Sequence, residues 1–159
     1  MSQNVFVYTM NRGTRSGSWS RYIFPFVVED YAYLGDDLYL RSGDTVYLVE
    51  PDSVYDSGIG FEAIIWWPYL DFGSPGVNKM VIGFDCVIDG EFDVQFGYNQ
   101  ATREGYTTKV RIPDDNVPGQ IIPMPINSPA MAVKITVPGG QDWRYYNFML
   151  YLQDNRRTA

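Results

Sequence analysis

The sequence has no histidine, a single cysteine and no long hydrophobic run. Without histidine, catalytic triads that need this residue and the common histidine-based zinc sites are excluded. Cys86 cannot form an intrachain disulfide, and it alternates with Phe84 and Ile88, so we expect a small buried hydrophobic residue. No apolar segment approaches the ~20 residues of a membrane span, and Met1–Asn4 does not resemble a signal peptide. We therefore expect a protein that is made in a cytoplasm, stays soluble and does not enter a membrane.

Amphipathic helices and clustered basic charge are also scarce. No stretch of about three helical turns keeps an apolar 3.6-residue period without a proline or a glycine inside it. Aromatic residues make up 16% of the chain, which favours β structure. The 12 basic residues are outnumbered by 19 acidic ones, giving a net charge of −7. Proteins that bind DNA tightly have clustered Lys and Arg, so the excess of acidic residues argues against tight DNA binding. It remains compatible with an acidic channel through which DNA passes.

Residues 1–50 are crowded with short strand candidates separated by turn residues, a rhythm typical of a propeller blade. Tyr8 and Trp19 are expected to pair across the first hairpin. One blade cannot close a ring, and its two edges would stay unpaired, so we expect another polypeptide to cover it. The predicted strands are Val5–Met10, Trp19–Val28, Tyr31–Leu34, Leu38–Arg41 and Thr45–Glu50.

A linker is expected at residues 51–60, a β-sandwich at residues 61–153 and a polar tail at residues 154–159. Prolines at 113–118 and 123–129 should confine the neighbouring strands to sheet edges or crossovers. The predicted strands of the sandwich are Phe61–Trp67, Lys79–Ile88, Glu91–Tyr98, Thr107–Ile112, Gln120–Met124, Ala130–Val137 and Tyr145–Gln153. The predicted fold class is therefore all-β, with a short blade-like antiparallel meander followed by a sandwich of about seven strands.

Two local patterns lie within the segment from Trp66 to Tyr98. Asp89-Gly90 between two apolar runs predicts a β-hairpin with a type I′ turn, in which both central residues have positive φ. After this turn Phe92, Val94, Phe96 and Tyr98 alternate with polar or small residues. This alternation predicts a strand with one buried face and one face in solvent.

The run from Trp67 to Gly76, followed by Lys79 and then Gly83-Phe84-Asp85, resembles the start of the C-terminal β-sandwich in phage tail hub proteins. These are the packaged-DNA stabilisation and tail-nozzle proteins of short-tailed phages. Residues 38–47, and Tyr8 with the segment Trp19–Pro25, are similar to the last propeller blade that precedes that sandwich. The likeness covers residues 4–152.

The resemblance implies a structural virion protein that forms a multimeric ring, with an expected sixfold symmetry, below the portal and adaptor. Such a ring retains packaged DNA and gives it passage during ejection, with transient DNA contact and no cofactor. Members of the family carry a full propeller before this blade. The rest of the propeller is therefore expected from a separate chain, or the protein is a reduced form. The expected location is the virion tail.

Catalysis and metal binding are not expected. The acid pairs Glu62 with Asp71 and Asp85 with Asp89 could act as two carboxylates across a glycosidic bond, but Asp71 and Asp89 lie in predicted turns. The adjacent acids Asp36-Asp37 and Asp114-Asp115 lack the spacing of a calcium loop and are interpreted as solvated turns. The sequence therefore predicts neither a catalytic nor a metal site.

The alternative function is a carbohydrate-binding sandwich on a phage tail or host-recognition protein, because exposed aromatic side chains can stack on sugars. The same aromatics are candidates for a subunit interface, and Trp66 and Trp67 must point to opposite faces of their strand. The candidates are Trp66, Trp67 and Trp143. A contact with DNA or an acidic partner is possible for the basic residues in or beside the first hairpin loop, Arg12, Arg15 and Arg21.

Overall fold

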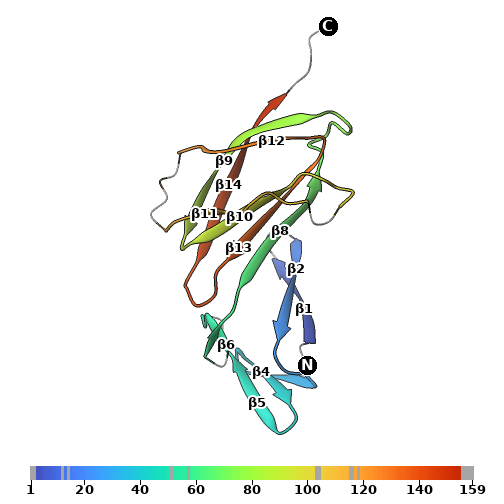
Figure 1. Cartoon of the computed structure of the whole chain (residues 1–159). Coiled ribbons are helices and arrows are strands. Elements are labelled where there is room, and N and C mark those ends of the chain that lie inside the picture. The colour runs from blue at the N-terminus through green and yellow to red at the C-terminus, as the bar shows by residue number, and fades with distance from the viewer. Residues whose placement is uncertain are drawn as a thin grey trace. The chain divides into compact units, whose positions relative to one another are not determined.

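A computed structural model of the chain is all-β, and the described residues contain no helix. It divides into two compact units, Met1–Ser53 and Val54–Ala159 (Figure 1). The all-β class predicted from the sequence, a meander followed by a sandwich, is confirmed. The structure describes residues 3–11, 13, 15–50, 52–56, 58–102, 105–114, 117 and 119–154.

The N-terminal unit contains two antiparallel sheets. The first is the hairpin of β1 (Gln3–Asn11) and β2 (Ser16–Phe24), in which Tyr8 lies opposite Trp19 as predicted, with ring centroids 5.0 Å apart. The second is the meander of β3 (Asp30–Leu34), β4 (Asp37–Ser42) and β5 (Thr45–Val49). The described strands therefore form a ribbon and a three-stranded sheet, where the sequence suggested a single blade.

A few contacts hold the segment that follows the ribbon, residues 25–29, against the meander. The ring of Phe26, in the segment between the two sheets, stacks on Tyr47 of β5 with centroids 4.0 Å apart. Glu29 forms an ion pair with Arg41 of β4 at 2.9 Å, and the Glu29 N–H donates to the Arg41 carbonyl. Leu40 is the one described hydrophobic residue of this unit that is buried. The unit therefore has aromatic stacking and hydrogen bonds but very little core.

The segment expected to be a linker contains a small hairpin of β6 (Tyr55–Asp56) and β7 (Ile59–Gly60). The Tyr55 hydroxyl donates to the carbonyl of Gly140 at 3.2 Å. Gly60 lies so close to the backbone at Gly139 and Gly140 that a Cβ atom would be 2.5 Å from the Gly140 nitrogen. This hairpin therefore belongs to the C-terminal unit, and the units divide between Ser53 and Val54.

The C-terminal unit is a β-sandwich, and all seven of its predicted strands are present. One sheet has the order β11-β10-β13-β8 and the other the order β12-β9-β14. The first sheet consists of β11 (Val110–Ile112), β10 (Phe92–Gly97), β13 (Met131–Val137) and β8 (Ala63–Leu70). The second consists of β12 (Ile122–Ser128), β9 (Lys79–Asp89) and β14 (Arg144–Asp154). The proline-containing strand β12 lies at a sheet edge, as predicted.

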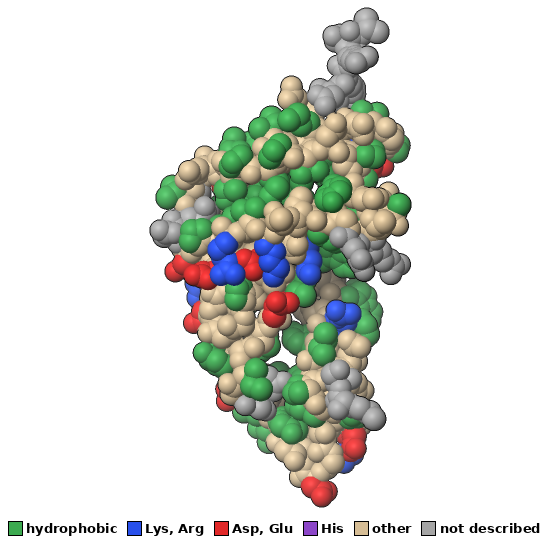
Figure 2. All heavy atoms as spheres, viewed as in Figure 1, with side chains coloured by type: hydrophobic (Ala, Val, Ile, Leu, Met, Phe, Trp, Pro, Cys, Tyr) green, Lys and Arg blue, Asp and Glu red, His purple; other side chains and the backbone are tan. Residues whose placement is uncertain are grey.

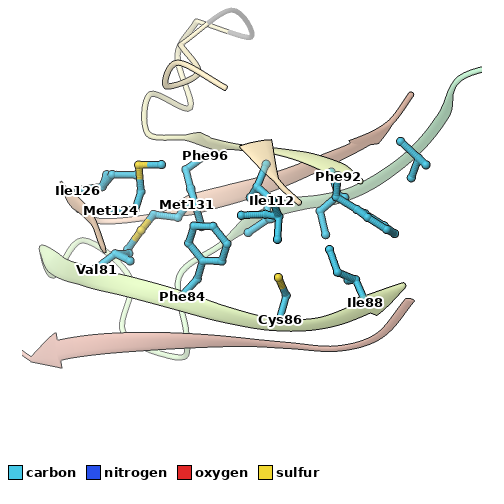
Figure 3. Packing of buried hydrophobic residues seen from close by; sticks show 14 residues of the cluster. Val81, Phe84, Cys86, Ile88, Phe92, Phe96, Ile112, Met124, Ile126 and Met131 are labelled. Carbon is cyan, nitrogen blue, oxygen red and sulfur yellow. The ribbon is translucent and has the colours of Figure 1, made fainter. Parts of the chain in front are cut away.

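The core of the molecule lies between these two sheets (Figure 3). Val81, Phe84, Cys86 and Ile88 of β9 point toward side chains of the facing sheet. Phe84 is central, with its ring centroid 5.4 Å from that of Phe96 and 5.2 Å from that of Phe148. Burial of Cys86 is confirmed, and desolvation, followed by the nearby Asp85 charge, raises the pKa of its thiol to about 11. Cys86 therefore packs as a hydrophobic residue.

The predicted hairpin at Asp89-Gly90 is wrong. Gly90 has a φ of +90°, but Asp89 is not in the left-handed region, so the turn is not type I′. β9 and β10 lie in different sheets, and the turn carries the chain from one sheet to the other. The Gly90 N–H donates to the Asp114 carboxylate at 2.6 Å, which fixes the crossover. A dipeptide signals a turn, but the packing of distant strands decides which sheet the next strand joins.

The predicted alternation in β10 is confirmed for one face and wrong for the other. Phe92, Val94 and Phe96 are buried in the core. On the opposite face Asp93 is only 6% exposed, whereas a solvated side chain was expected. Arg111 of β11 and Lys109, just before that strand, cover this carboxylate, as described below. Tyr98 lies beyond the end of the strand and is 47% exposed.

Candidate interaction surfaces

Three of the four acids considered as catalytic groups, Asp71, Asp85 and Asp89, have structural hydrogen-bond partners. The Asp71 carboxylate accepts a hydrogen bond from the Gly73 N–H at 2.9 Å, as expected for a turn. The buried Asp85 accepts from the Gly119 N–H at 2.8 Å, and the exposed Asp89 accepts from the Tyr146 hydroxyl at 2.8 Å. Among the described residues no group of three or more metal-ligating acids or cysteines is found. Asp115 lies outside the described residues.

The three candidate tryptophans have different environments. Trp66 is 62% exposed on β8, whereas the neighbouring Trp67 packs against the core with its ring 5.7 Å from that of Phe148. The two side chains therefore lie on opposite faces of the strand, as the alternation required. Trp143 also packs against the core and meets the Phe92 ring edge-on. Trp66 is thus the one of the three that offers a large aromatic surface to a ligand or a partner.

The strand register places polar and charged residues beside Trp66 on the outer face of its sheet. Directly opposite residues of an antiparallel pair share a face. Trp66 lies opposite Lys134, and Lys134 lies opposite Gln95. In the adjacent row Ile64, Thr136, Asp93 and Arg111 are aligned across all four strands. We call the surface formed by Ile64, Trp66, Gln95, Lys134 and the charged residues around Asp93 the Trp66 face.

The charged part of the Trp66 face is an ion-pair cluster. The Nε and Nη2 atoms of Arg111 donate to the Asp93 carboxylate. Arg111 also forms an ion pair with Glu91 through its Nη1 atom at 2.9 Å. Lys109 lies 3.5 Å from the same Asp93 carboxylate. The hydrogen bond from Arg111 is the main cause that lowers the pKa of Asp93, although the burial of this carboxylate acts in the opposite direction. Figure 2 shows basic side chains in a row across this face with acidic ones among them.

Lys134 differs from the other two cations of this face. No described acid lies within ion-pair distance of it, whereas Arg111 and Lys109 share Asp93. Asp93 and Glu91 are thus already engaged at the β11 side of the sheet. Next to Trp66 the face therefore carries an unneutralised positive charge, with Gln95 beside it.

A bulge brings a second aromatic residue toward this region. The register of β13 and β8 shifts between Met131 and Val133, so that two residues of β8 lie opposite one of β13. The Tyr69 hydroxyl then donates to the Asn99 carbonyl at 2.9 Å and lies over Gly97. Burial is the main cause that raises the pKa of this phenol. This contact requires a glycine at position 97, because a Cβ atom there would lie 2.7 Å from the Tyr69 oxygen.

The basic residues of the first hairpin are only partly described. Arg12 lies outside the described residues. Arg15 is exposed and has a φ of +53°, and Arg21 is exposed on β2 opposite Phe6. Neither Arg15 nor Arg21 takes part in an ion pair with a described acid. Their role as a DNA or partner contact stays a prediction.

Apolar surface is concentrated on the N-terminal unit. Phe6 is 64% exposed and Trp19 is 70% exposed, although both lie in regular strands. A contiguous apolar surface on a soluble protein usually marks an interaction site. The other exposed large hydrophobic residues described in this unit are Val7, Tyr8, Met10, Tyr22, Ile23, Val27, Tyr31, Tyr33, Leu34, Val46 and Leu48.

An apolar cleft of about 350 Å³ opens at the edge of the sandwich where β8 and β14 are the outermost strands. Its lining contains no charged side chain, so it has no group for acid–base chemistry. Trp67, one of the candidate interface residues, forms part of its wall. The lining residues are Trp67, Leu70, Phe72, Met131, Val133, Tyr145, Phe148 and Leu150.

The sequence indicated Trp66 only together with Trp67 and Trp143, and it missed the charged residues beside Trp66. The alternation in β10 places Asp93 and Gln95 on one face, which was a usable signal. Asp93 and Gln95 come to lie beside Lys134, Arg111 and Trp66 only because four strands that are distant in sequence pair with one another. That pairing cannot be obtained from a local pattern.

No protein-family model, curated protein or solved structure matches the chain. The described residues contain no helix of the length and apolarity needed to cross a membrane. The likeness to phage tail hub proteins therefore rests on the sequence features given above.

Proposed function

We propose that the protein is a structural subunit of a phage tail hub or nozzle. In this role identical copies form a ring at the head–tail connection that retains packaged DNA and lets it pass during ejection. Portal, adaptor or a separate propeller-bearing chain are the expected neighbours in the virion. The sequence resemblance of residues 4–152 motivates this assignment.

The observation that carries the proposal is the composition of the N-terminal unit. Leu40 is its one buried hydrophobic residue among those described, while Phe6, Trp19 and Leu34 are largely exposed. Two short sheets without a shared core gain little free energy from folding alone, because burial of apolar surface is the main favourable term. A unit of this kind suits a protein whose folding is completed by assembly.

The mechanism is mechanical. The sandwich has a continuous hydrophobic core and supplies a stiff body, and the N-terminal sheets supply exposed apolar surface for contacts with partners. A net charge of −7 keeps the wall of such a ring from binding DNA tightly, so DNA moves through it without strong adhesion. Exposed basic residues such as Arg15 and Arg21 can make only transient phosphate contacts.

Electron microscopy and mass measurement test the proposal. The purified full chain, alone and mixed with portal and adaptor proteins, is examined by negative-stain microscopy and light scattering. We expect closed rings of one defined copy number. A chain that stays monomeric in every mixture and turns over a substrate would overturn the proposal.

The second candidate is carbohydrate binding, and one observation favours it. Trp66 presents an exposed ring beside the hydrogen-bonding groups of Gln95 and Lys134, an arrangement that can stack a sugar ring and bond its hydroxyls. A glycan array probed with the full chain and with Trp66→Ala tests this function. Binding that disappears in the variant, without ring formation by the full chain, would favour the carbohydrate-binding module.

A further inference from the structure

We propose that the Trp66 face receives the acidic end of the N-terminal meander of a second copy of this chain. The inference rests on the proposed function, since it names the surfaces through which subunits would join. The inference follows from two surfaces on different units of the chain. Both carry exposed apolar side chains, but one is positively charged and the other is negatively charged.

The receiving surface lies on the sandwich. Trp66 and Ile64 are 62% and 49% exposed on the edge strand β8, and Lys134 lies opposite Trp66 without a described acidic partner. Asp93 is already bonded to Arg111 and Lys109. A partner that brings an acidic group beside an apolar one can therefore contact Trp66 and Lys134 together.

The complementary surface lies at one end of the meander. The turn between β3 and β4 carries the exposed residues Asp36 and Asp37, and Leu34 before it is 72% exposed. Val49 of β5 lies opposite Leu38, so the exposed Glu50 emerges at this same end. The sole basic residue of the sequence from 30 to 52 is Arg41, which forms an ion pair with Glu29.

One face of the meander is open for such a contact. Leu40 and Tyr47 are paired on one face, where Phe26 stacks on Tyr47. Leu48 lies on the other face with Tyr39, and Val46 shares that face opposite Arg41; Leu48 and Val46 are 45% and 62% exposed. Leu34, opposite Asp37, continues this open apolar surface to the acidic turn.

A second copy fits these observations better than a small ligand. The contact joins different surfaces of the two copies, and such a heterologous interface closes into a ring when the rotation allows it. Opposite charges beside apolar groups fix the register and orientation of the contact, whereas like charges there are strongly unfavourable. Each copy would carry one donor surface and one acceptor surface.

Charge reversal tests this pairing in the full chain. Lys134→Glu places a negative charge against the acidic turn, and Asp36→Lys with Asp37→Lys places positive charges against Lys134. We expect either change to weaken self-association about tenfold or more in sedimentation velocity. The chain that carries all three changes should regain assembly, because the charges are again opposite. Arg144→Glu, an exposed charge outside both surfaces, is the matched control and should assemble like the unchanged chain.

Mixing adds a second readout. In an equal mixture of the Lys134→Glu and Asp36→Lys/Asp37→Lys chains, every contact between unlike chains joins opposite charges, because the unchanged surfaces meet each other and the reversed surfaces meet each other. The mixture should therefore assemble with the two chains alternating, whereas neither variant should assemble alone. Folding of each variant is checked by circular dichroism and by its melting temperature.

The outcomes separate this inference from the proposed function. If the unchanged chain forms rings and the reversed variants form them equally well, the pairing proposed here is wrong while the ring function stands. If the Lys134→Glu variant loses binding to a glycan or to single-stranded DNA but associates normally, the Trp66 face belongs to that ligand and the inference is overturned. If no mixture with virion proteins produces an oligomer, both are overturned.

Discussion

Lys79 is a buried cation whose ammonium group is bonded to three backbone carbonyls. It donates to Ser74 at 2.7 Å, Val77 at 2.9 Å and Pro129 at 3.1 Å. One side chain thus ties the Gly- and Pro-rich turn before β9 to the connection between β12 and β13. Lys79, which follows the segment Trp67–Gly76 in the sequence, therefore has a structural role in holding this turn.

Replacing Lys79 should destabilise the sandwich. Lys79→Met keeps much of the aliphatic stem but leaves three carbonyls without their charged donor, so we expect a loss of about 2–4 kcal/mol in the free energy of unfolding. Urea denaturation followed by tryptophan fluorescence measures it. Lys134→Met, on the outer face, is the control and should change stability by less than about 0.5 kcal/mol. Equal effects of the two substitutions would contradict the structural role of Lys79.

Asp93 gives the protein a pH dependence whose sign can be derived. The hydrogen bond from Arg111 lowers the pKa of this carboxyl in the folded state below the unfolded value of about 3.9. The stabilisation is therefore fully present above the unfolded pKa and is lost as the pH falls through the folded pKa. Asp93→Asn removes the titrating group, so its stability should vary less with acidification.

Denaturation curves at a series of acidic pH values check this expectation. The unchanged chain should lose more stability than Asp93→Asn as the pH falls from about 5 to about 2. Glu91→Gln is the control, because the Glu91 ion pair is half exposed and contributes little. Parallel curves for Asp93→Asn and the unchanged chain would show that Asp93 does not contribute to the pH dependence.

At the scale of strands, local sequence predicted most positions but not all partners. Alternation and turn residues located all seven strands of the sandwich, because these signals depend on neighbours along the chain. The pairing after Asp89-Gly90 was wrong, because β9 has β12 and β14 as its neighbours, and both lie far along the chain. The burial of Asp93 was missed for the same reason, since its cover comes from Arg111 on another strand. Alternation alone predicted that Trp66 and Trp67 lie on opposite faces of the strand, but not which of the two is exposed.

Gly83 lets β9 and β12 approach closely. A Cβ atom at this position would lie 2.4 Å from the Ile122 carbonyl oxygen and 2.7 Å from a methyl group of Ile121. The carbonyl belongs to the backbone and cannot move away cheaply. Gly83→Ala should therefore lower the free energy of unfolding by about 1–3 kcal/mol through overpacking. Ile82→Ala, at the adjacent exposed position, is the control and should cost less than about 1 kcal/mol. A stabilised Gly83→Ala chain would show that the strands can separate at this point.

At the scale of the whole molecule, the two units differ in how they bury apolar surface. The sandwich has a continuous core with Phe84, Phe92 and Phe96 fully buried, whereas Leu40 is the one buried hydrophobic residue described in the N-terminal unit. The sequence predicted an N-terminal sheet with unpaired edges that another polypeptide covers, but it did not predict that this unit has almost no core. It also did not predict the division of the N-terminal strands into two sheets, which depends on contacts such as that between Phe26 and Tyr47.

Hydrogen exchange measures the consequence of this contrast. In the isolated chain at low concentration, amides of β1 to β5 should exchange quickly, because local opening exposes little new apolar surface there. Amides of β9, β10 and β13 should be protected, since they open only when the hydrophobic core is disrupted. In the assembled ring the N-terminal amides should gain protection, with the largest gain in β3 to β5 if the meander meets the Trp66 face. Equal protection of both units in a chain shown to be monomeric would mean that the N-terminal sheets are stable without a partner, which removes the physical reason for assembly.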